Sequence, residues 1–199
     1  LIHIIYTAKT RFLNAAKNIP RTVNGVKVLI GAEVNILDAA GNIDLPPDVL
    51  SSLDVVIASI HRDLFEPINK KAHTQAYLNV LDNPYVDIIG HSGSPDYEYN
   101  IAAVLEKAKK EHKMIEINNN SHLIRKGSIQ NCINIAKKCA EMGVYVVVGS
   151  DAHFSQSVGN FSEAVSMLKQ IDFPQELIAN LNLERFLSIL RKRKMIIGL

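Results

Sequence analysis

The chain has 199 residues, of which 47% are apolar and 21% charged, and its formal net charge is +2. This composition fits one globular domain with a hydrophobic core, excludes a disordered chain, and argues against sequence-independent binding of nucleic acid. No apolar run approaches the roughly 20 residues that span a bilayer, no signal peptide is recognisable, and there are only two cysteines, Cys132 and Cys139. We therefore expect a reduced, cytoplasmic protein that does not bind membranes.

Short apolar runs rich in β-branched residues recur along the chain. They cover residues 26–33, 54–61, 85–91, 114–118 and 144–151. Runs of this kind are typical of strands that are buried on both faces, as in a parallel sheet.

Helical periodicity fills the intervals between the later runs and the C-terminal part of the chain. It predicts helices over residues 71–81, 99–112, 128–142, 161–171 and 175–192, and one or two turns within residues 47–53. Pro174 separates the last two helices. The alternation predicts an α/β fold with a parallel sheet, in a single domain over residues 1–199.

A polar residue able to do chemistry stands at the end of each predicted strand. In chain order these residues are Glu33, His61, His91, Asn118 and Asp151, and His153 follows two residues later. In β/α barrels the carboxyl ends of the strands form one rim, where active sites gather. Imidazoles and carboxylates are ligands of zinc, manganese and iron. The pattern predicts a metal site made by Glu33, His61, His91, Asp151 and His153, although any one of them alone is more often a loop-capping group.

Other polar residues give weaker signals. Arg125 and Lys126 follow the fourth predicted strand, and they either meet a phosphate or remain solvated. We interpret His73 and His112, on predicted helices, as surface residues. His122 is interpreted as a solvated loop residue, with contact to a substrate as the alternative. A basic run at residues 191–194 is interpreted as a complement to a helix dipole, and nucleic-acid binding is the alternative.

Several stretches resemble the polymerase and histidinol phosphatase (PHP) superfamily, specifically its small stand-alone bacterial phosphatases. They are residues 31–36, 53–61, 83–91, 116–119 and 149–153. The resemblance implies a distorted seven-stranded β/α barrel that holds up to three divalent metal ions and hydrolyses small phosphorylated substrates. Zinc is the first expectation, with manganese or iron as alternatives.

The resemblance also implies individual roles. Glu33 resembles the carboxylate that bridges two ions, and His61 and His91 resemble ligands of the second ion. Asp151 resembles a ligand of the first ion and His153 a ligand of the third. On this basis Glu33 and Asp151 are the expected catalytic residues.

The chain departs from that family at its start. Such proteins open with a His-x-His strand and a Thr-Asp-His strand, and neither motif precedes Glu33. We interpret His3 as a surface or strand histidine, and a ligand that replaces one of the missing residues is the alternative. We therefore expect a barrel that is incomplete at the N-terminus and that holds fewer than three metal ions. Its exposed strand edge would pair with a second copy of the chain, or the chain is a fragment of a longer protein.

Three functional interpretations follow. The first is a metal-dependent phosphoesterase of phosphate monoesters, with low activity or none in this chain. The alternative is a catalytically degenerate PHP-fold module that binds metal or regulates. A nucleic-acid-processing role is the third, since PHP domains also occur attached to DNA polymerases, and the near-neutral charge disfavours it.

Overall fold

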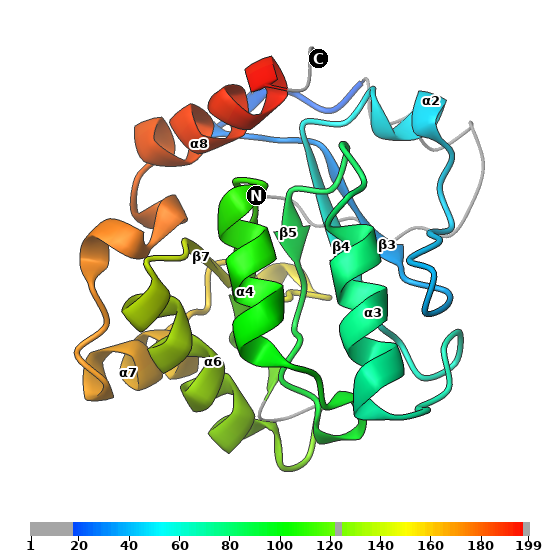
Figure 1. Ribbon diagram of the computed structural model, residues 1–199. Helices are drawn as coiled ribbons and strands as arrows, with labels where there is room; N and C mark the ends of the chain where they lie inside the picture. Colours follow the sequence, from blue (N-terminus) through cyan, green and yellow to red (C-terminus); the bar gives the residue numbers. More distant parts are fainter. Residues whose placement is uncertain (1–17, 122–124, 197–199) are drawn as a thin grey trace.

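The computed structural model describes residues 18–121 and 125–196 (Figure 1). At its centre is a parallel sheet of order β3-β4-β5-β6-β7. Its strands are β3 (Gly31–Asn35), β4 (Val55–Ser59), β5 (Ile88–Ile89), β6 (Met114–Asn118) and β7 (Val146–Gly149). The predicted α/β fold with a parallel sheet is confirmed. These five strands do not close into a barrel within the described residues, so the seven-stranded barrel stays a prediction.

Helices cover both faces of the sheet. Figure 1 shows α3 (Lys70–Val80), α4 (Ile101–Lys110) and α6 (Ser128–Met142) side by side on one face, and α7 (Ser162–Gln170) packs against α6. The shorter elements are α2 (Pro47–Leu50) and the 3-10 turns η1 (Pro95–Tyr97) and η2 (Ser155–Ser157). None of the described helices is both long and apolar enough to cross a bilayer.

The alternation of side chains along the strands creates two separate cores. Residues such as Val34, Val56 and Ile89 belong to the larger core. Their neighbours Ile57 and Ile88 face the opposite way and pack with Phe186 and Leu190 of α8 (Leu183–Ile196). Because both faces are covered, the strands read as continuous apolar runs in the sequence.

The first predicted strand has the wrong boundaries. Val26–Lys27 (β2) pairs antiparallel with Thr22–Val23 (β1) through a turn in which Asn24 and Gly25 have φ of 49° and 78°. Asn-Gly suits this two-residue turn because both residues tolerate the left-handed region. The sheet strand begins only at Gly31, and Glu33 therefore lies inside β3 rather than at its end.

The last predicted helix is also wrong in part. Instead of one helix over residues 175–192, two 3-10 turns, η3 (Gln175–Leu177) and η4 (Ala179–Leu181), precede α8. Within them the Asn180 amide donates to the Val148 carbonyl at 2.8 Å and accepts from the Val148 N–H at 2.9 Å. The side chain thus satisfies the backbone at the β7 edge of the sheet, as a neighbouring strand would.

Removing this amide is expected to destabilise the sheet edge. Asn180→Ala leaves two backbone groups of Val148 without partners, and we expect the free energy of unfolding to fall by roughly 2 kcal/mol. Urea denaturation measures this. Asn134→Ala, which loses only an exposed contact with Gln130 on α6, is the control and should cost less than about 0.5 kcal/mol. Equal stability of the two variants would contradict the edge role of Asn180.

Candidate metal centre

The sheet face that α8 covers becomes polar toward the carboxyl ends of the strands. Glu33 on β3 is in register with Ile57 on β4, so both side chains point to this face. Along β6, Glu116 and Asn118 alternate in the same sense as Met114, which packs in the core beneath α8. These polar side chains are buried. Burial of carboxylates at this depth requires compensating partners, and the surrounding residues supply them.

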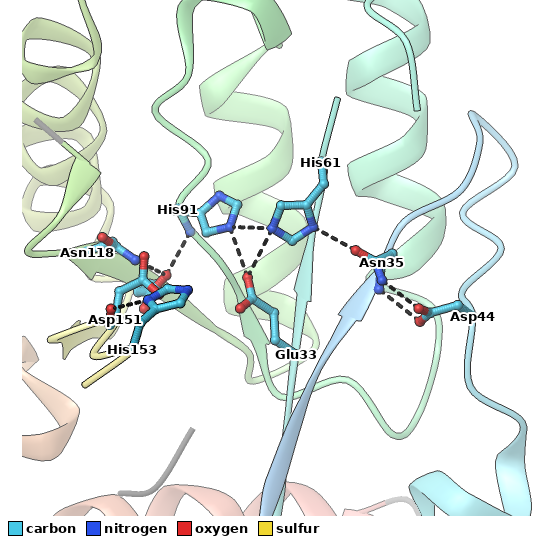
Figure 2. Close-up of polar contacts among 9 residues, drawn as sticks. Glu33, Asn35, Asp44, His61, His91, Asn118, Asp151 and His153 are labelled. Carbon is cyan, nitrogen blue, oxygen red and sulfur yellow. Dashed lines mark hydrogen bonds and ion pairs between the residues drawn. The ribbon is translucent and has the colours of Figure 1, made fainter. Parts of the chain in front are cut away.

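Glu33, His61 and His91 converge at this end of the sheet (Figure 2). Glu33 Oε1 lies 2.9 Å from His91 Nε2 and 3.6 Å from His61 Nε2. The two Nε2 atoms are 3.1 Å apart. One ligand atom from each residue therefore lies within 4.8 Å of the others, an arrangement suited to holding a cation. The parallel strands bring these three residues together as the sequence predicts.

Asp151 and His153 occupy the loop after β7. Figure 2 shows them beside Asn118, on the other side of His91 from His61. Asp151 is buried, the His153 side chain is half exposed, and His153 Nδ1 lies 3.8 Å from Asp151 Oδ1. Neither joins the three-residue cluster, so their role as ligands stays a prediction. His3 and His122 lie outside the described residues.

The charges in the cluster favour a cation. Burial raises the pKa of Glu33, but the hydrogen bond and charge of His91, with smaller effects of Ser59 and His61, outweigh it and lower the pKa to about 2. Burial and the neighbouring His91 charge lower the pKa of His61. At neutral pH these shifts leave an ionised carboxylate beside an unprotonated imidazole, the states in which both groups bind metals.

Two of the candidate ligands have unusual backbone conformations. His91 has φ of 24° and Asp151 has φ of 48°, a region that residues other than glycine rarely adopt. Hydrogen bonds hold both in place: Glu116 Oε2 accepts from His91 N at 2.9 Å, and Asn120 Nδ2 donates to the Asp151 carbonyl at 2.9 Å. Strain of this kind persists only where the surroundings enforce it, and it concentrates at functional sites.

Glu116 is a site residue that the sequence reasoning missed. The Glu116 Oε2 atom that accepts from His91 N also lies 3.4 Å from Asn118 Nδ2. A Cβ atom on Gly149 would come within 2.2 Å of Glu116 Oε1, so the absence of a side chain at Gly149 makes room for this carboxylate. A single charge inside the apolar run 114–118 was the available signal.

Asn35 and Asp44 were also missed. Asn35 Oδ1 lies 2.7 Å from His61 Nδ1, and the Asp44 carboxylate accepts from both the backbone and the side-chain nitrogen of Asn35. The predicted strand ended at Glu33, so Asn35 was not recognised as a strand residue that faces the site. Asp44 lies in a loop whose path the sequence does not reveal.

Two further predictions have different outcomes. His73 was expected at the surface, which is wrong: it is buried, accepts from Ile68 N at 2.9 Å, and bonds the Glu98 carbonyl at 3.0 Å.

Arg125 is directed inward, and its Nη1 atom is buried with no hydrogen-bond partner in the part of the chain that the structure describes. The positive charge of Arg125 contributes to the lowered pKa of His61.

Comparison with known proteins identifies the relatives of this chain. A probable phosphatase of Thermoanaerobacter sp. (strain X514) is 47% identical over 184 residues, which are 92% of this chain and 75% of the relative. This chain belongs to that family of probable phosphatases. Another member, from Clostridium novyi (strain NT), is 46% identical over 178 residues, covering 89% of this chain and 73% of its own length. No model of a known protein family matches the chain.

Among solved structures, the fold of this chain resembles that of a chain in the cryo-EM structure of archaeal ribonuclease P with mature tRNA. The TM-score is 0.55 at 12% sequence identity, over 98% of this chain and 82% of that one. At this identity the likeness concerns the fold alone.

The low pKa of Glu33 predicts a specific dependence of stability on pH. Because the folded-state pKa of about 2 lies below the ordinary value of 4.5, ionised Glu33 stabilises the fold above pH 4.5, and this contribution is lost as the pH falls toward 2. For the metal-free protein we expect the stability advantage of wild type over Glu33→Gln to shrink by roughly 2 kcal/mol between pH 6 and pH 3.

Urea denaturation across this pH range measures the difference. Glu106→Gln, on the exposed side of α4, is the control and should track the wild type at each pH. A constant gap between wild type and Glu33→Gln would show that Glu33 has no depressed pKa in the folded state.

Proposed function

We propose that the protein is a metal-dependent phosphatase that hydrolyses phosphate monoesters of small substrates. The observation that carries this proposal is the convergence of Glu33, His61 and His91 on one point at the carboxyl edge of the sheet. Membership of a family of probable phosphatases supports the reaction class. The PHP-like motifs that contain these residues support metal dependence.

The donor set fits a divalent cation that takes part in catalysis. One carboxylate and two imidazoles are ligands for zinc, and manganese and iron accept the same set. Catalytic zinc sites have three protein ligands and keep a position open, whereas structural sites use four. Asp151 and His153, at the same end of the sheet, are proposed to extend the site toward a further cation.

Different residues around such a site would hold the cation, position its ligands and bind the substrate phosphate. A divalent cation held there would act as a Lewis acid, which would polarise a phosphoryl oxygen and lower the pKa of bound water. Glu33, His61 and His91 would hold the cation, and Glu116 fixes the backbone at which the His91 ring is attached. Among the residues that the structure describes, Arg125 Nη1 has no hydrogen-bond partner, and a planar guanidinium suits phosphate oxygens. We assign it to the binding of the substrate phosphate.

The decisive test combines metal binding with turnover. Protein stripped with a chelator is titrated with Zn²⁺, Mn²⁺ or Fe²⁺, and hydrolysis of p-nitrophenyl phosphate is followed. We expect metal to restore turnover and His91→Asn to reduce both metal affinity and turnover by about 100-fold or more, because a ligand is lost.

His112→Asn is the matched control, because His112 also has a positive φ, of 53°, and no place in the site. Asparagine tolerates this conformation at both positions. If the protein binds metal but none of the three metals supports turnover, the result would favour a catalytically degenerate metal-binding module over a phosphatase. Turnover that survives both chelation and His91→Asn would exclude metal-dependent catalysis at this centre.

Arg125→Ala tests the phosphate-binding role separately. Loss of a charge-assisted hydrogen bond costs about 1.5–3 kcal/mol, so we expect KM for p-nitrophenyl phosphate to rise roughly ten- to hundredfold with metal affinity unchanged. Steady-state kinetics measure this. Lys126→Ala, at the exposed neighbouring position, should leave KM as in wild type. An unchanged KM for Arg125→Ala would remove Arg125 from the phosphate site.

A further inference from the structure

A series of hydrogen-bonded side chains connects the loop before α2 to the candidate metal centre. It runs from the Asp44 carboxylate through the Asn35 amide to the His61 imidazole, and Figure 2 shows it to the right of Glu33. Asp44 Oδ1 accepts from Asn35 N at 2.9 Å, Asp44 Oδ2 accepts from Asn35 Nδ2 at 2.5 Å, and Asn35 Oδ1 meets His61 Nδ1 at 2.7 Å. Asn35 is buried, so its amide has few other partners to choose from.

The first link fixes the orientation of the Asn35 amide. An ionised carboxylate only accepts hydrogen bonds, whereas the two ends of an amide differ, since its nitrogen donates and its oxygen accepts. Asp44 therefore requires the Asn35 nitrogen to face it. The oxygen of Asn35 must then face His61.

The second link fixes the tautomer of His61. Because the amide oxygen of Asn35 accepts, His61 must donate to it from Nδ1. A neutral imidazole carries one proton, so Nε2 is left with a free lone pair. This Nε2 atom is the one that lies beside Glu33 Oε1 and His91 Nε2.

The loop that carries Asp44 is held in place by backbone contacts. Leu37 N donates to the Asn42 carbonyl at 2.8 Å, and Ile36 and Ile43 form an antiparallel bridge, which closes the loop that leads to Asp44. The loop packs closely on the end of α3, where a Cβ atom on Gly41 would lie 2.6 Å from Val80 N. Asp44 thus has a defined position from which to orient Asn35.

We propose that Asp44, acting through Asn35, is a positioning residue that holds His61 in the Nδ1–H tautomer and so presents Nε2 as a metal ligand. This inference rests on the proposed function in taking His61 as a ligand. Outer hydrogen-bond partners of metal-binding histidines fix tautomer and ring orientation, and their loss typically costs 10–100-fold in metal affinity. Here an amide stands between the carboxylate and the imidazole.

The test reads the tautomer directly. Long-range ¹H–¹⁵N spectra of the metal-free wild type are recorded at a pH at which His61 is neutral, with its signals assigned by their absence in His61→Asn. We expect the proton on Nδ1. In Asp44→Asn the new amide can donate to the Asn35 oxygen, so Asn35 is free to turn. We then expect the proton of His61 to be found on Nε2 in part or in full, and the Zn²⁺ affinity to fall by roughly 10–100-fold.

Asp38→Asn is the matched control. Asp38 lies in the same loop and accepts from Asn42 N and Nδ2, away from His61, so its replacement should leave both the tautomer and the affinity unchanged. A wild-type His61 with its proton on Nε2 would overturn the proposal, as would an Asp44→Asn variant with the wild-type tautomer. If the wild type binds no Zn²⁺, the proposed function fails, while the tautomer in the wild type and in Asp44→Asn still decides the role of Asp44.

Discussion

The burial of one carboxylate between two imidazoles is the interaction on which the rest of this structure depends. Glu33 lies within a strand and is almost inaccessible to solvent. A carboxylate in that position is costly unless cations or hydrogen-bond donors surround it. His61 and His91 meet this requirement from the segments that follow β4 and β5, and their Nε2 atoms lie 3.6 Å and 2.9 Å from Glu33 Oε1. The same arrangement that compensates the charge also concentrates metal-binding atoms.

The architecture serves this arrangement in a simple way. Consecutive parallel strands place consecutive strand ends side by side, so residues distant in sequence meet without any long loop. The apolar lower part of the same face is closed by Phe186 and Leu190 of α8. This leaves the polar end as the place where charged groups can meet a ligand. Glu116 on β6 and Asn35 on β3 then act from the two sides of the site, one on the backbone of His91 and the other on the ring of His61.

Much of this was readable in the sequence, because it depends on periodicity. Short apolar runs with helical segments between them predict a parallel sheet, and a parallel sheet predicts that Glu33, His61 and His91 meet. What could not be read depends on tertiary contacts. Asp44 reaches the site only because its loop folds back on α3, and His73 is buried because Phe65 and Tyr97 enclose its ring. The Asn-Gly pair at residues 24–25 is a turn signal in the sequence, and it separates the hairpin strands from the sheet strand that begins at Gly31.

Binding of a divalent cation by Glu33, His61 and His91 is the central claim, and anomalous diffraction at the zinc absorption edge tests it most directly. Crystals grown with Zn²⁺ should show an anomalous peak within coordinating distance of Glu33 Oε1, His61 Nε2 and His91 Nε2, at about 2.0–2.2 Å from each. A map with no peak between these three atoms, or with peaks only elsewhere on the protein, would contradict a metal centre at this position.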